Sequence, residues 1–140
     1  MNVMDIVDTI IKIAVSVYKQ LGCGYTEFVY QRAMEIELRT HKINYENEKR
    51  VSVYYKDANG TLNTISENRL DLYVYAENGE QVMVELKSMS RTIHPNDIEQ
   101  LKRYRKMLEF DNLYPSRGVL INFPQSANKT VEISKVLFEQ

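Results

Sequence analysis

The spacing of apolar residues predicts two helices at the start of the chain. Aliphatic residues recur at intervals of three and four up to Gly22, at Ile6, Ile10, Ile13, Val17 and Leu21. This spacing lines one face of a helix, and a glycine is a common helix end. A second helix is expected from about Thr26 to His41. Thr26 would be its N-cap, and Glu27 would lie in the first turn, where the helix dipole favours a carboxylate.

The pattern then changes to the alternation of apolar and polar residues that is typical of β-strands. A strand is expected around residues 51–55, followed by a tight hairpin at Asn59-Gly60 and a short pairing strand near residues 61–66. A helix should run from Pro95 to about Phe110, because proline suits the first turn of a helix. The apolar run of residues 118–123 predicts a buried strand. Residues 130–138 fit either an edge strand or a short helix.

The register of a hairpin over residues 70–87 follows from its aliphatic residues. A two-residue turn at Asn78-Gly79 would point the aliphatic rows of the two strands to opposite faces of the sheet. A three-residue loop, with the glycine in the left-handed conformation, instead sets Leu72 opposite Val84. Leu70 would then face Leu86. We therefore expect the three-residue loop.

The same register sets Asp71 directly opposite Glu85, with Cβ atoms about 4.5–5.5 Å apart. Two like charges about 4 Å apart repel by roughly 4 kcal/mol at an effective dielectric constant of 20. A positive charge should therefore lie between them. Lys87 shares the face of Glu85 because side chains alternate with a period of two, and a divalent cation is the other candidate.

Composition limits the setting of such a site. At 140 residues, with 44% hydrophobic and 26% charged residues, the chain is expected to be one soluble domain spanning residues 1–140. The single cysteine and the charged residues within the N-terminal apolar stretch favour an intracellular, cytoplasmic protein without a membrane span. The net charge of −1 means that nucleic acid would have to be attracted by a local patch. One basic run with an interleaved tyrosine, residues 100–106, is either such a patch or the solvated face of a helix.

Five segments together resemble the GxxExxY family, a branch of the PD-(D/E)xK nuclease-like superfamily. They occur in the order and approximate spacing of that family: GYTEFVY (24–30), RLDLYV (69–74), VMVELKS (82–88), EQLKRY (99–104) and GVLINF (118–123). The resemblance implies an α/β fold with a restriction-endonuclease-like core, in which helices flank a mixed β-sheet. It also implies a nuclease that hydrolyses phosphodiester bonds of DNA or RNA with Mg²⁺ or Mn²⁺.

The resemblance assigns a role to each matching residue. Glu27, Asp71 and Glu85 would bind the metal, and Lys87 would activate water or stabilise the charge that develops on phosphorus. Gln100 would position water or phosphate. A homodimer or a larger partner would extend the small footprint of such a chain on a duplex.

The chain departs from the family pattern near Gln100. The pattern has a histidine three residues earlier, where this chain has Asp97, although Pro95 matches; His94 lies out of register. We assign no catalytic role to His94 or Asp97, since a histidine at a helix start is more often a cap. Two alternatives therefore stand beside the nuclease: a non-catalytic nucleic-acid-binding or regulatory module that keeps the fold, and a structural ion network without a ligand.

Overall fold

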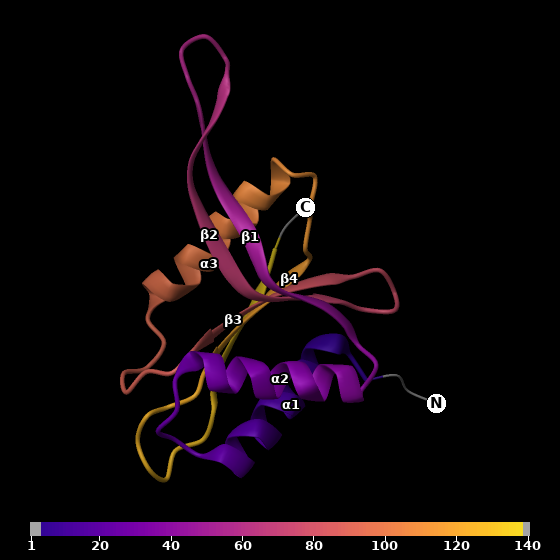
Figure 1. Ribbon diagram of the computed structural model, residues 1–140, viewed down its shortest axis with the longest axis vertical. Coiled ribbons are helices and arrows are strands. Elements are labelled where there is room, and N and C mark those ends of the chain that lie inside the picture. Colours follow the sequence, from indigo (N-terminus) through magenta and orange to yellow (C-terminus); the bar gives the residue numbers. More distant parts are fainter. Residues whose placement is uncertain (1–3, 139–140) are drawn as a thin grey trace.

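The computed structural model describes residues 4–138, which form three helices and five strands (Figure 1). In chain order these elements are α1 (Ile6–Leu21), α2 (Glu27–Thr40), β1 (Asn44–Lys56), β2 (Leu62–Tyr75), β3 (Gln81–Lys87), α3 (Pro95–Glu109), β4 (Arg117–Asn122) and β5 (Glu132–Leu137). The predicted helices are confirmed to within a few residues. Residues 130–138, for which the sequence allowed an edge strand or a short helix, contain the edge strand β5.

The five strands make one mixed sheet in the order β1-β2-β3-β4-β5. Neighbouring strands run antiparallel except β3 and β4, which are parallel and are joined through α3. Helices α1 and α2 cover one face and α3 covers the other (Figure 1). The expected α/β fold, a mixed sheet flanked by helices, is confirmed.

Each face of the sheet has its own core. The core under α1 and α2 includes Ile10, Tyr30, Leu72, Val84 and Phe123. The core under α3 includes Tyr73, Met83, Leu101, Leu108 and Val136. Along β3, successive side chains point alternately to the two faces of the sheet. Glu85 and Lys87 therefore point to the same face as Met83, away from the core under α1 and α2.

The hairpin between β2 and β3 has the three-residue loop expected from its aliphatic face. The N–H of Ala76 donates to the carbonyl of Glu80 at 2.8 Å, which closes the loop over residues 77–79. Gly79 has a φ of 91°, a conformation that other residues adopt only with strain. Leu72 pairs with Val84, as predicted.

The prediction that Leu70 faces Leu86 is wrong. The β2–β3 ladder ends at Leu72 and Val84, and Leu70 packs in the core under α3, whereas Leu86 packs under α1 and α2. The neighbouring strand is irregular at the same level. Glu48 has a φ of 50° and pairs with no residue of β2, whereas Asn47 pairs with Leu72 and Lys49 pairs with Leu70.

Strands β1 and β2 are both longer than the apolar pattern predicted. Strand β1 begins at Asn44, well before the first alternating valine, and β2 is one strand from Leu62 rather than two separate stretches. The first half of β2 pairs with the second half of β1, and together they form a hairpin that projects beyond the sheet (Figure 1). The turn at Asn59-Gly60 is confirmed by the hydrogen bond from the N–H of Asp57 to the carbonyl of Thr61 at 2.9 Å.

The first helix is a core helix. It begins where the Asp5 carboxylate accepts from the N–H of Val7 at 2.8 Å, and it ends before Gly22, whose φ is 72°. Its apolar face is buried against the sheet. None of the helices within residues 4–138 has the length and apolar character needed to cross a membrane.

Candidate active site at the end of the β2–β3 ladder

Asp71 and Glu85 meet where β2 separates from β3. The Asp71 carboxylate accepts from the backbone N–H of Leu86 at 2.7 Å, just beyond Leu72 and Val84, the last paired residues of the ladder. The Glu85 side chain lies close to Asp71, whose charge and hydrogen-bonding groups act on the pKa of Glu85. The Asp71 side chain thus bonds to the backbone of β3 just where the ladder ends. The sequence predicts that these two residues lie directly opposite each other; the structure brings their side chains close together, although the ladder ends one pair before them.

The surroundings of Glu85 raise the pKa of its carboxyl group. Glu85 is only 8% exposed. Its burial, and then the charge of Asp71, raise its pKa to about 9, although the charge of Lys87 and the N–H of Asp71 oppose the rise. A pKa this high keeps Glu85 protonated at neutral pH in the absence of a cation. A cation that replaced this proton would relieve the same repulsion.

Glu27 reaches toward the pair from the other side of the site. Its place in the first turn of α2 is confirmed, and Thr26 is the N-cap, although its side chain makes no capping hydrogen bond. Loss of contact with water and then the charge of Asp71 raise the pKa of Glu27, while Lys87 and the N–H of Ser88 oppose this. Glu27 therefore lies within the electrostatic reach of Asp71 and Lys87. Its carboxyl does not join the hydrogen-bonded pair.

A set of contacts outside the predicted site fixes where α2 begins. Gly24 has a φ of 106°, and its N–H donates to the side chain of Gln125 at 2.8 Å. The Gln125 amide also donates to the Tyr30 hydroxyl at 3.3 Å, and the Tyr30 ring stacks on Phe123 with ring centroids 4.4 Å apart. These contacts tie the first turn of α2 to the end of β4, so they hold Glu27 beside the sheet. Sequence reasoning did not identify Gln125.

Gln100 and Tyr104 approach the carboxylates from α3. The Gln100 amide donates to the Tyr104 hydroxyl at 3.3 Å, and both side chains are half-buried. Burial first, and then the negative charge of Glu85, raise the pKa of Tyr104, and Asp71 acts in the same direction. Tyr104 is therefore a neighbour of the pair, and it holds Gln100 next to it.

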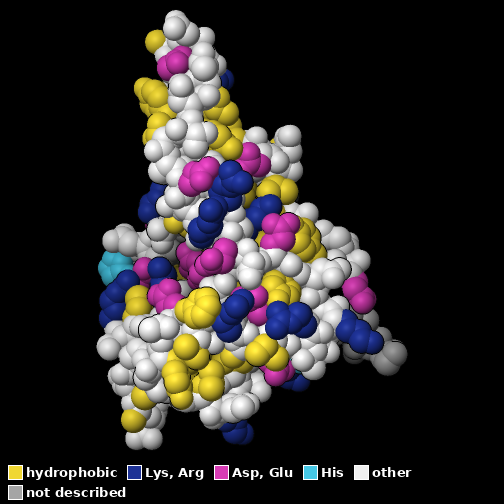
Figure 2. Space-filling view, in the orientation of Figure 1, with side chains coloured by type: hydrophobic (Ala, Val, Ile, Leu, Met, Phe, Trp, Pro, Cys, Tyr) yellow, Lys and Arg dark blue, Asp and Glu magenta, His cyan; other side chains and the backbone are white. Residues whose placement is uncertain are grey.

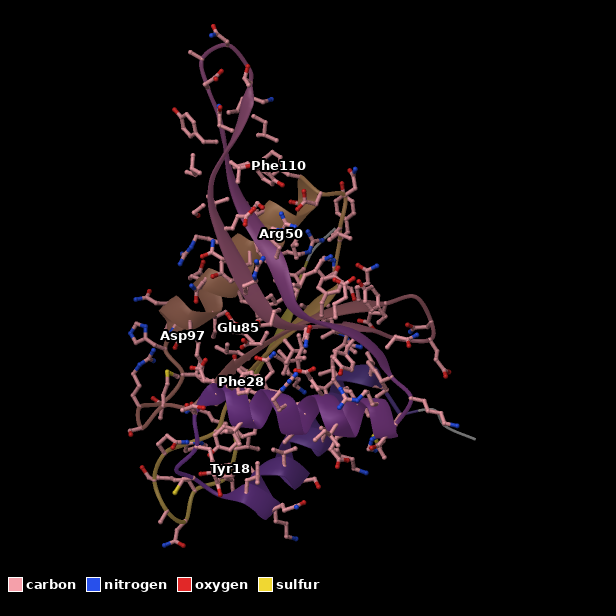
Figure 3. All side chains as sticks on the ribbon, viewed as in Figure 1. Tyr18, Phe28, Arg50, Glu85, Asp97 and Phe110 are labelled. Atoms are coloured by element: carbon pink, nitrogen blue, oxygen red, sulfur yellow. The ribbon has the colours of Figure 1, made fainter. Side chains whose placement is uncertain are left out.

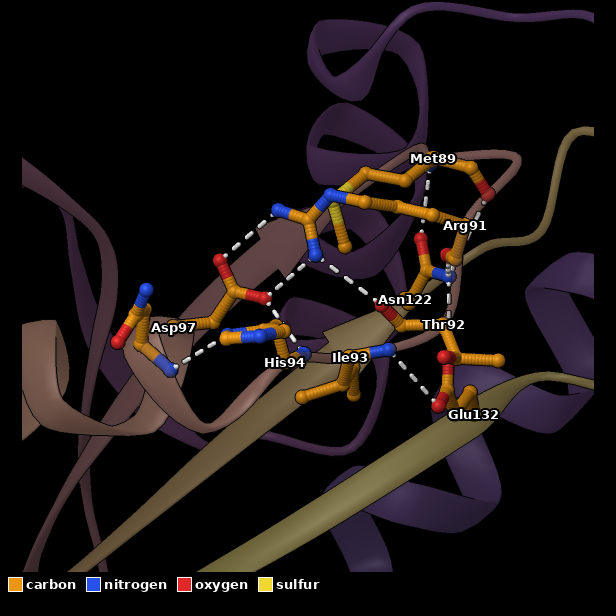
Figure 4. Close-up of polar contacts among 9 residues, drawn as sticks. Met89, Arg91, Thr92, Ile93, His94, Asp97, Asn122 and Glu132 are labelled. Carbon is orange, nitrogen blue, oxygen red and sulfur yellow. Dashed lines mark hydrogen bonds and ion pairs between the residues drawn. The ribbon is translucent and has the colours of Figure 1, made fainter.

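The departures from the family pattern have structural roles at the start of α3 (Figure 4). His94 is the N-cap, and its ring accepts from the N–H of Asn96 at 3.1 Å. Asp97 accepts two hydrogen bonds from Arg91, at 2.9 and 3.1 Å, and one from the N–H of His94 at 2.8 Å. The Arg91 guanidinium lowers the pKa of Asp97 to about 2. Asp97 thus stays charged and fully engaged in holding the loop before α3.

A buried asparagine ties this loop to the sheet (Figure 4). Asn122 is 1% exposed and accepts from the N–H of Met89 at 2.8 Å. Its amide donates to the carbonyl of Arg91 at 3.2 Å and to Glu132 at 3.1 Å. Glu132 also accepts from the N–H of Ile93 at 2.9 Å. The segment that follows Lys87 is therefore held on β4 and β5. Sequence reasoning missed Asn122, although a single polar residue inside an apolar run was its signal.

The basic run of residues 100–106 does not act as one patch. Arg105 is buried, donates to the carbonyl of Pro115 at 2.7 Å, and lies over the rings of Tyr114 and Phe138. Lys102 pairs with Glu99 at 3.5 Å on the surface. On the face seen in Figure 2, charged side chains of both signs lie at the centre and hydrophobic side chains gather below them.

The predicted metal ligands are only partly assembled. Within residues 4–138, no three histidine, cysteine, aspartate or glutamate side chains lie close enough together to hold a metal ion as they stand. Asp71 and Glu85 touch, and Lys87 follows on the same strand. Glu27 and Gln100 border them from two helices. Their roles in metal binding and catalysis remain predictions.

Comparisons with known proteins agree on the architecture. The family model described as the PD-(D/E)XK nuclease superfamily matches residues 4–136. The crystal structure of SSO0001 is similar to this chain, with a TM-score of 0.52 and 18% sequence identity over 80% of the chain. The match spans 50% of the length of SSO0001, and at this identity it shows the fold alone. The search of curated proteins found no match.

Proposed function

Because the chain belongs to the PD-(D/E)XK nuclease superfamily, we propose that it is a metal-dependent nuclease that hydrolyses phosphodiester bonds of DNA or RNA. The observation that carries this proposal is the closeness of Asp71 to the buried Glu85, where burial and then the charge of Asp71 raise the pKa of Glu85. A fold does not need two neighbouring carboxyl groups at a strand end. The pair is costly unless a cation uses it.

The donors at the pair suit Mg²⁺ or Mn²⁺. Hard divalent cations bind carboxylate oxygens, and Mg²⁺ in proteins is held by one or two carboxylates together with water. Asp71 and Glu85 would supply these two, and Glu27 would approach from α2 as a third ligand. When bound, a divalent cation polarises the phosphoryl group and lowers the pKa of water.

The other residues would act on the substrate directly. Lys87 lies two residues after Glu85 on β3, and its charge already acts on both Glu85 and Glu27. Its ammonium group would stabilise the negative charge that develops on the phosphoryl oxygens. Gln100, held by Tyr104, would donate to a phosphate oxygen or orient the attacking water.

A cleavage assay tests this proposal. Single-stranded and double-stranded DNA and RNA would be incubated with the protein in Mn²⁺ or in EDTA. We expect products only with Mn²⁺, no products with Lys87→Ala, and unchanged products with Lys12→Ala, an exposed lysine of α1 that matches the charge change. Equal cleavage by the Lys87→Ala protein, or no cleavage of any substrate, would contradict the proposal.

A non-catalytic binding or regulatory module that keeps the nuclease fold is the second candidate. The observation that favours it is that no three histidine, cysteine, aspartate or glutamate side chains within residues 4–138 are grouped closely enough to hold a metal ion. Nucleic-acid binding with no cleavage in Mn²⁺ would support this candidate. Cleavage lost on Lys87→Ala would exclude it.

Within the superfamily we infer the GxxExxY branch. The three residues that name the branch each have a structural or chemical use: Gly24 adopts a positive φ, Glu27 borders the pair, and Tyr30 anchors α2 on Phe123. One nuclease domain over residues 1–140, an intracellular location and a homodimer remain predictions from the sequence.

A further inference from the structure

Two exposed aromatic side chains flank Glu27. Tyr25 is 44% exposed and Phe28 is 59% exposed. Helix α2 packs through its other side, with Tyr30, Gln31, Met34, Glu35 and Leu38 buried. Phe28 therefore adds little to the core. Single exposed apolar residues are ordinary on protein surfaces, so the position of this ring beside a candidate site residue is what calls for an explanation.

A guanidinium group supports the Phe28 ring. The Arg32 guanidinium carbon lies 5.2 Å from the ring centroid, at the distance of a cation–π contact. Figure 3 shows Phe28 at the start of α2, and the residue before it, Glu27, lies close enough to Asp71 and Lys87 for their charges to act on its pKa. A polyanion held at the carboxylate site would therefore have a supported aromatic ring and a positive charge nearby.

We propose that Phe28, supported by Arg32, stacks on an unpaired nucleobase next to the phosphodiester bond that the carboxylate site receives. The substrate class would be single-stranded nucleic acid, or a duplex with an unpaired nucleotide at that point. This inference rests on the proposed nuclease function. The bases of a duplex are stacked on one another and present only their edges, whereas an unpaired base presents a face to an aromatic side chain.

The distribution of charge supports a single strand over a duplex. The net charge is −1, and several cations are already engaged by carboxylates: Lys49 with Glu46, Arg50 with Glu67, Arg91 with Asp97 and Lys102 with Glu99. Cations engaged in this way contribute less to binding the phosphates of a long duplex, and phosphate contacts are the main source of duplex affinity. Stacking on Phe28 supplies affinity that does not require additional cations.

Binding without metal tests the inference apart from chemistry. Fluorescence anisotropy in EDTA would compare a short oligothymidylate, an oligouridylate of the same length and a DNA duplex of that length. We expect tighter binding of the single strands, about tenfold weaker binding of them by Phe28→Ala, and retention by Phe28→Tyr. Duplex binding should not change. Binding of one single strand only would identify DNA or RNA as the substrate.

Phe110→Ala is the matched control, because Phe110 is 51% exposed at the far end of α3 from Glu85 (Figure 3). It should bind like the wild type, and thermal melting should show all variants folded. No binding of either single strand by the wild type, a preference for the duplex, or equal effects of Phe28→Ala and Phe110→Ala would overturn the inference.

The outcome can be separated from that of the nuclease proposal. Binding that depends on Phe28, without cleavage in Mn²⁺, would remove the nuclease and keep the stacking platform. Cleavage that depends on Lys87, without an effect of Phe28→Ala on binding, would remove only the platform.

Discussion

Glu85→Gln should make the metal-free protein more stable at neutral pH. Glutamine keeps the shape of the side chain, can accept from the N–H of Asp71, and can donate to the Asp71 carboxylate. It removes the charge that burial and Asp71 disfavour. At neutral pH the wild type must therefore take up a proton at Glu85 when it folds, and this costs free energy that the variant does not lose.

The magnitude follows from the shifted pKa. The pKa of Glu85 is about 9 in the folded protein, against an ordinary value of 4.5. Between these values the folded state binds more protons than the unfolded state, so the free energy of unfolding falls as pH rises. One pH unit in this window corresponds to about 1.4 kcal/mol. Between pH 5.5 and 7.5 the wild type should lose about 3 kcal/mol relative to Glu85→Gln.

Urea unfolding followed by circular dichroism in EDTA, at several pH values in this window, measures the difference. Glu99→Gln is the control, since Glu99 is 56% exposed in a surface ion pair and its variant should follow the wild type. Parallel pH dependence of the wild type and Glu85→Gln would refute the reasoning, because it would mean that Glu85 ionises normally in its buried position.

Three further substitutions test the contacts around the site. Asp97→Asn should lower the free energy of unfolding by about 1–2 kcal/mol at neutral pH, because it loses the ion pair with Arg91 and the capping interaction. Since the pKa of Asp97 is lowered in the folded protein, urea unfolding should show this difference vanish as the pH falls from about 4 to 2. Asn122→Leu should cost about 2–4 kcal/mol by leaving partly buried partners such as Glu132 unsatisfied, and hydrogen exchange should show faster opening of residues 88–93. Tyr30→Phe should cost about 1 kcal/mol in thermal melting, because it loses the hydroxyl bond to the Gly22 carbonyl but keeps the stacked ring.

The local patterns that predicted the carboxylate pair are visible in the sequence. Alternating aliphatic residues and a glycine that suits a positive φ determine the register of β2 and β3, and this register brings Asp71 and Glu85 together. The same reasoning failed at Leu70, because the β2–β3 ladder ends at Leu72 and Val84 and the aliphatic residues beyond it pack in different cores. An argument from alternation holds only as long as the two strands stay paired.

The supports of the site were beyond sequence reasoning for a related reason. Gln125 and Asn122 contact segments that are far away in the chain: Gly24 in one case and Met89 in the other. Nothing in their local surroundings shows which backbone groups they satisfy. The role of Asp97 was equally open, because its partner Arg91 lies in a loop whose path depends on the tether to β4.

Isothermal titration calorimetry with Mn²⁺ tests the central claim most directly. The wild type should bind Mn²⁺ at a site that disappears in the Asp71→Asn/Glu85→Gln double variant, which keeps the size of both side chains. It should persist in Glu99→Gln. No binding by the wild type, or equal binding by the double variant, would contradict the assignment of this pair as the metal site.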